Sequence, residues 1–97
     1  MATVSEKLLP EFKDRMHISH GAEDDNLKRI LEASITNLQR LCGSFDVFSD
    51  PEAKELVFER SRYVYNDSLE FFENNFLGQI LSLSLDKLPS EGGESND

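Results

Sequence analysis

The chain has 97 residues and a formal net charge of −9, from 19 acidic and 10 basic side chains. A single domain of this length buries roughly 60–65% of the surface of its unfolded chain, so a monomer has a modest core. The acidic balance argues against a protein that coats DNA, because affinity for phosphates needs clustered Lys and Arg. We find neither a signal-peptide pattern nor an apolar run near the roughly 20 residues of a membrane helix, and expect a cytosolic protein without a membrane partner.

A first, short helix is predicted over residues 9–16. Pro10 has no amide hydrogen and therefore belongs in a first turn rather than in the middle of a helix. Leu9, Phe12 and Met16 fall on one side of this helix. The sequence HISHGAED then ends it.

A second helix is predicted over residues 24–42. Acidic side chains at Glu23, Asp24 and Asp25 favour the positive end of a helix dipole, and Gly43 is a plausible C-cap. The apolar positions repeat with a helical period and form one stripe. This stripe contains Leu27, Ile30, Leu31, Ser34, Ile35, Leu38, Leu41 and Cys42.

A third helix is predicted over residues 51–74, with Asp50 as N-cap and Pro51 in the first turn. It would be about 36 Å long. The segment after it is either a short C-terminal helix or an extended arm, because LSLSLDKL also alternates like a strand. We expect an all-α bundle of three main helices, with residues 1–88 as one helical domain and residues 89–97 as a disordered acidic tail.

The third helix carries two apolar stripes and an acidic side. The first stripe consists of Ala53, Val57, Arg60, Val64, Ser68 and Phe71. The second consists of Phe58, Tyr65, Leu69, Phe72 and Phe76, and the acidic side carries Glu52, Glu55, Glu59, Glu70 and Glu73. Two interpretations stay open for the second stripe: helices of the same chain cover it, or a neighbouring subunit does.

Arg60 interrupts the first stripe, and a buried arginine needs a polar partner. Two interpretations are equally consistent with the sequence. Arg60 could form a structural ion pair, with Asp67 two turns later or Asp46 in the preceding loop as the candidate partner. Alternatively, its side chain could reach solvent at the edge of the core.

No motif of the sequence indicates catalysis. His17 and His20 form an HxxH pair without a second cluster of metal ligands. Cys42 lies in an apolar stripe, where a free cysteine behaves as a small hydrophobic residue. The chain has no phosphate-binding glycine loop, no GxSxG and no CxxC. We therefore expect a protein that is not an enzyme and needs neither metal nor cofactor.

Three consecutive stretches carry a resemblance to a known family. They are LLPEFKDRMHI, GAEDDNLKRILEAS and LCGSFDVFSDPEAKELVFERSRYVYNDSLEFFENNF. Their order and spacing resemble the small helical head–tail connector (adaptor) proteins of phages and prophages of Firmicutes, over about residues 8–85. Pro10 departs from the acidic or polar residue that is more usual there, and the C-terminal tail matches no feature of the family.

The resemblance implies a structural protein of the virion neck, assembled in the host cytoplasm. It implies a ring of about twelve subunits beneath the portal protein. Such a ring extends the DNA channel, lets DNA pass without specific binding, and docks the next head-completion or tail protein. The alternative we retain is a small helical DNA-binding or regulatory interaction module, although both of its longer helices begin with acidic residues.

These implications nominate two sets of residues. The candidates for subunit or portal contacts are Phe58, Tyr65, Leu69, Phe72, Phe76, Ile80, Leu81, Leu83 and Leu85. The candidates for a channel lining are Glu52, Glu55, Glu59, Glu70 and Glu73, because a negative lumen would not retain DNA. We also expect the segment 76–88 to leave the helical body and pack on a neighbouring subunit or on the portal.

Overall fold

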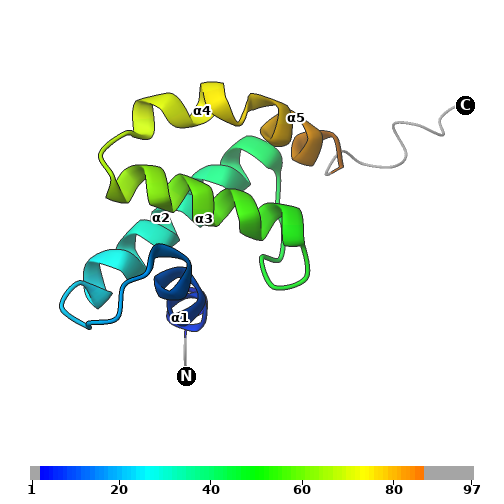
Figure 1. Cartoon of the computed structure of the whole chain (residues 1–97). Coiled ribbons are helices and arrows are strands. Elements are labelled where there is room, and N and C mark those ends of the chain that lie inside the picture. Colours follow the sequence, from blue (N-terminus) through cyan, green and yellow to red (C-terminus); the bar gives the residue numbers. More distant parts are fainter. Residues whose placement is uncertain (1–2, 87–97) are drawn as a thin grey trace, which may run out of the picture.

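The computed structural model describes residues 3–86, and these residues contain helices and no strand (Figure 1). The predicted all-α class is confirmed, but the count of three main helices is wrong, since the described residues form five α-helices. In chain order the elements are α1 (Val4–Met16), α2 (Asp24–Cys42), α3 (Pro51–Tyr65), the single-turn 3-10 helix η1 (Leu69–Phe71), α4 (Phe72–Asn75) and α5 (Leu77–Asp86). The tail predicted over residues 89–97 lies outside the described range.

Helix α1 begins earlier than predicted, at Val4 instead of residue 9. Thr3 caps it: the Thr3 hydroxyl accepts a hydrogen bond from the Glu6 amide at 3.1 Å, and the Glu6 carboxylate accepts one from the Thr3 amide at 2.9 Å. This reciprocal pair is a capping box. Pro10 therefore lies inside the helix, on its exposed side, while Leu8 and Phe12 are buried and hold α1 against the core.

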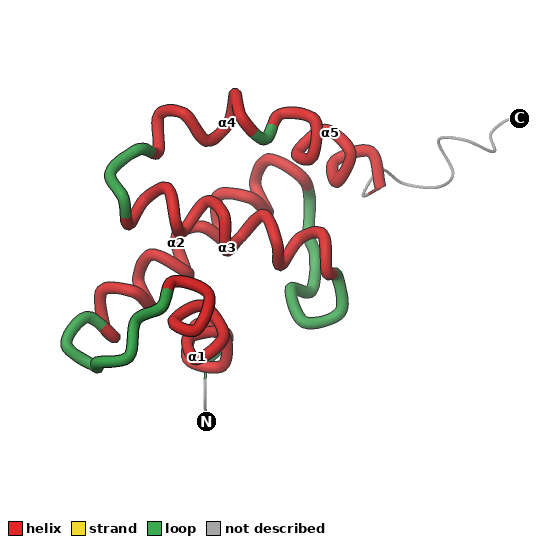
Figure 2. Tube along the Cα trace, viewed as in Figure 1, coloured by secondary structure: helices red, strands yellow, loops and turns green. Residues whose placement is uncertain are grey.

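Helix α2 has the predicted bounds and is the centre of the fold. It contacts α1, α3 and α5 (Figure 2). Its buried side chains come from the predicted stripe: Leu27, Ile30, Leu31, Ser34, Leu38 and Cys42. A helix with one apolar stripe and clear ends can be placed from sequence because local and tertiary preferences agree.

Helix α3 ends at Tyr65, nine residues before the predicted end at residue 74. Asp67 adopts a left-handed backbone with φ 58°, and the Ser68 amide donates to the Tyr63 carbonyl at 2.8 Å. An αL residue followed by this hydrogen bond closes a helix C-terminus. The chain then turns back, so the second stripe does not continue along one long helix.

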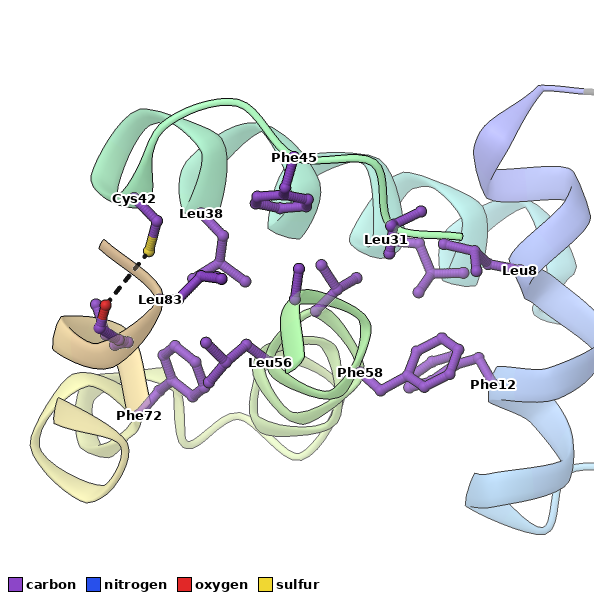
Figure 3. Close-up of a cluster of buried hydrophobic side chains, with 14 of the residues drawn as sticks. Leu8, Phe12, Leu31, Leu38, Cys42, Phe45, Leu56, Phe58, Phe72 and Leu83 are labelled. Atoms are coloured by element: carbon purple, nitrogen blue, oxygen red, sulfur yellow. Dashed lines mark hydrogen bonds between the residues drawn. The ribbon is translucent and has the colours of Figure 1, made fainter. Parts of the chain in front are cut away.

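Helix α5 packs on α2 and α3 of the same chain. Ile80 and Leu83 are buried, and the Cys42 thiol lies 3.7 Å from the Ile80 carbonyl oxygen (Figure 3). The predicted alternative of an extended arm is therefore wrong up to Asp86, as is the expectation that this segment leaves the helical body. Helix α5 folds back onto its own chain because this buries the apolar side of the helix.

The core runs continuously from α1 to α5 (Figure 3). At one end the rings of Phe12 and Phe58 stack with their centroids 5.6 Å apart. At the other end Phe72 and Leu83 approach α2 and α3 beside Leu38. Helices from both ends of the chain thus cover the two sides of α3.

The turn after α3 predicts which of two Asp67 variants is the more stable. Asp67→Gly should be more stable than Asp67→Ala by about 1–2 kcal/mol, because alanine in the left-handed region clashes with the following carbonyl and glycine does not. In the continuous helix predicted from sequence, glycine would instead be worse than alanine by about 1 kcal/mol. Denaturant unfolding of the two variants, followed by circular dichroism, distinguishes these outcomes. A more stable Asp67→Ala chain would contradict the turn.

Candidate assembly surface

The residues nominated for contacts with a partner divide into two groups. The structure buries Phe58, Phe72, Ile80 and Leu83, and Tyr65 and Phe76 pack against the same core. These six residues contact their own chain, which corrects their nomination as a partner surface. The aromatic second stripe is covered from within because the chain reverses at Asp67 and returns Phe72 and Phe76 to the ring of Tyr63.

Three leucines of α5 remain exposed and form what we call the leucine ridge. Leu77, Leu81 and Leu85 are 50%, 53% and 66% exposed. They follow one another at every fourth residue and therefore share one side of the helix. Leu81 and Leu85 were nominated from sequence. Leu77 was missed, although the spacing of four residues could have identified it.

The ridge borders a shallow hollow at the C-terminal end of α2. Leu41, Leu77 and Leu81 line it together with Glu73. Leu41, a member of the apolar stripe predicted for α2, is also exposed. Ser84 also lines this hollow, and its hydroxyl donates to the Ile80 carbonyl at 2.9 Å. The apolar surface thus extends from α5 onto α2.

Arg60 is held by α2 rather than by the nominated Asp67. Its guanidinium donates to the Ser34 hydroxyl oxygen at 3.1 Å, and the buried Ser61 hydroxyl approaches the same oxygen at 3.0 Å. Burial lowers the pKa of Arg60, and the nearby charge of Glu73 acts in the opposite direction. No Arg60–Asp67 ion pair occurs among residues 3–86. The ion-pair alternative with Asp67 is therefore wrong, because α3 ends before Asp67.

The five nominated glutamates do not form one row. Glu55 and Glu59 bind Arg15 of α1 at 2.7 and 3.2 Å. Glu59 also accepts from Arg62 at 2.6 Å, and this bond raises the pKa of Arg62. These two glutamates therefore tie α1 to α3 and are partly neutralised, which weakens their assignment to a channel lining.

The remaining nominated acids lie on separate elements. Glu52 is half-buried in the first turn of α3, whereas Glu70 and Glu73 are exposed on η1 and α4. Glu70 and Glu73 line a hollow beside Arg60 and Leu69. Leu69 is a nominated apolar residue that stays exposed.

A third hollow runs along the outer side of α2, and we call it the arginine groove. Ile30, Ala33 and Val64 form its apolar part, with Arg29 and Arg40 on its lining. Within the described part of the chain, neither arginine has a carboxylate within 4 Å. Both arginines lie outside the apolar stripe predicted for this helix, and sequence analysis assigned them no role.

The described residues were also searched for metal sites and membrane spans. Between residues 3 and 86, no three His, Cys, Asp or Glu side chains gather closely enough to hold a metal ion. In the same range, no helix has both the length and the apolar composition to cross a membrane.

Comparisons of this chain with protein-family models, with curated proteins and with solved structures found no match.

Proposed function

We propose that this chain is a head–tail connector that assembles as a ring beneath a phage portal protein. The observation that carries the proposal is the leucine ridge, a row of three exposed leucines on a helix whose other side is docked on the core. A small domain with an apolar row of this kind, continued by Leu41, presents a surface suited to another protein. The resemblance described above supports the choice of partner.

The charge distribution supports the same proposal. The chain carries a net charge of −9, and Glu70 and Glu73 are exposed on one side of the fold. In a ring, acidic side chains facing the channel would let DNA pass without retaining it. We propose Glu52 and Glu70 for this lining. We omit Glu55 and Glu59 because Arg15 binds both, and Glu73 because it lies beside the leucine ridge.

The test combines this chain with the portal protein of the same phage or prophage and examines the complex by negative-stain electron microscopy. In the micrographs we expect an added ring on the portal. In the proposed virion neck, this ring would be the attachment site for the next neck or tail protein. At low concentration without the portal we expect mainly monomer, because the portal acts as template. A portal that stays undecorated by the unmodified chain would refute the connector function.

A variant with Leu77→Asp, Leu81→Asp and Leu85→Asp should lose the added ring, because three carboxylates cannot be buried without partners. The matched control carries Val4→Asp and Phe48→Asp, which alter two exposed apolar residues elsewhere on the surface. This control should decorate the portal like the unmodified chain. If the ridge variant decorates the portal as well as the unmodified chain does, the leucine ridge is not needed for the ring.

A further inference from the structure

We propose that the leucine ridge of one copy docks in the arginine groove of a second copy, so that copies join head to tail. The inference deepens the proposed connector function by naming the two surfaces through which subunits meet. It rests on that function for the expectation that copies associate. Its physical basis is the match between ridge and groove in apolar character and in the charges toward their ends.

The groove has apolar residues between two arginines, and Asn26, Glu32, Thr36 and Asn37 complete its lining. The Glu32 carboxylate accepts a hydrogen bond from the Ser5 hydroxyl at 2.7 Å. Arg29 and Arg40 are eleven residues apart, which is about three helical turns, and therefore lie on the same side of α2 about 16 Å apart. Ile30, Ala33 and Val64 lie between or beside them. Since Arg29 and Arg40 have no carboxylate within 4 Å among the described residues, both are available to pair with a partner.

The ridge has the complementary pattern. Leu77 and Leu85 are about 12 Å apart along α5. Glu73 lies four residues before Leu77, and Asp86 follows Leu85 directly. Both acids are exposed and have no cation within 4 Å in the described range. An apolar row with an acid toward each end therefore matches a groove that has an apolar part and an arginine toward each end.

The two surfaces lie on different sides of α2. Helix α5 approaches α2 at Leu41 and Cys42, next to the buried Leu38. Arg40 follows Leu38 by two residues and so projects about 200° around the helix from it. A contact between two different patches is heterologous, and repeated heterologous contacts form a ring when the rotation closes. This pairing would therefore produce the ring that a connector requires.

Cross-linking between two cysteine variants tests the contact directly. Ala33→Cys places a thiol in the groove and Leu81→Cys places one on the ridge, both at exposed positions. At high protein concentration, with a short thiol-reactive cross-linker, the mixed variants should give a cross-linked dimer. Each variant alone should give only the background of the unmodified chain, whose Cys42 is buried. Equal dimer yields from either variant alone, or none from the mixture, would overturn the proposal.

Charge reversal supplies a second, independent readout. Arg29→Glu with Arg40→Glu in the groove partner should abolish the cross-link, as should Glu73→Lys with Asp86→Lys in the ridge partner. Combining both reversals should restore the cross-link, because each charge again faces an opposite charge across the contact. All four positions are exposed, so circular dichroism should show unchanged helix content. A cross-link that persists through the single reversals would show that the arginines do not face the ridge.

The results separate this inference from the connector function. Portal decoration without a cross-link between Ala33→Cys and Leu81→Cys would overturn the inference and leave the connector function standing. A cross-link between these variants of a chain that does not bind the portal would leave the inference standing and overturn the connector function. A third outcome is that the groove reversal removes binding of duplex DNA but leaves cross-linking unchanged. The arginines would then bind nucleic acid, and the inference would be overturned.

Discussion

Replacing Leu83 by alanine should lower the free energy of unfolding by about 2–5 kcal/mol, the usual cost of emptying a fully buried leucine site. Leu83 is 1% exposed on the inner side of α5. A domain of this size has a total stability of about 5–15 kcal/mol, so the variant should unfold at clearly lower denaturant concentration. Chemical denaturation followed by circular dichroism measures the difference.

The matched control is Leu81→Ala, two residues earlier on the same helix and 53% exposed. Because little buried volume is lost there, its effect on stability should stay within about 0.5 kcal/mol. A similar, small effect for both variants would mean that α5 is not docked on its own chain. Such a result would restore the expectation that the segment leaves the helical body.

Replacing Phe72 by alanine should cost about 3–5 kcal/mol, because the ring is buried and surrounded by other rings. Phe72 is 1% exposed, and its ring centroid lies 5.7 Å from that of Tyr63 and 5.1 Å from that of Phe76. The continuous helix predicted from sequence places Phe71 on the first apolar stripe and Phe72 on the second. In the structure Phe72 is buried and Phe71 is exposed.

The neighbouring Phe71→Ala is the control, since Phe71 is 55% exposed and its loss should change stability by at most about 0.5 kcal/mol. If Phe72→Ala does not fold, Phe72→Leu should still cost less than about 1.5 kcal/mol, because it keeps most of the volume. Thermal unfolding of the three variants gives the ranking. A larger loss at Phe71 than at Phe72 would favour the long helix and contradict the turn at Asp67.

Much of the fold follows from local patterns. The single stripe and acidic start of α2 predict its bounds correctly. The start of α3 is also correct, because the Asp50 side chain accepts from the Ala53 amide at 3.2 Å and Pro51 occupies the first turn. Each of these signals acts within a few residues and is therefore visible in the sequence.

The candidate assembly surface was predicted less well. Leu69, Leu81 and Leu85 were nominated and are exposed, whereas Leu77 and the groove lined by Arg29 and Arg40 were not foreseen. The nominated Phe58 and Phe72 are core residues. Periodicity identifies apolar sides of helices, but it does not say whether the same chain or another covers them.

The sequence alone determined the all-α class, the extent of α2, the start of α3 and the excess of apolar surface on residues 58–76. Only the tertiary structure decided what covers that excess. The reason is the left-handed turn at Asp67, which local propensity does not require but which lets Phe72, Ile80 and Leu83 reach the core. Burial of these side chains favours the reversal over a longer helix. Phe58 and Phe72 of the aromatic stripe consequently face inward, whereas Leu69, Phe71 and three leucines of α5 stay exposed.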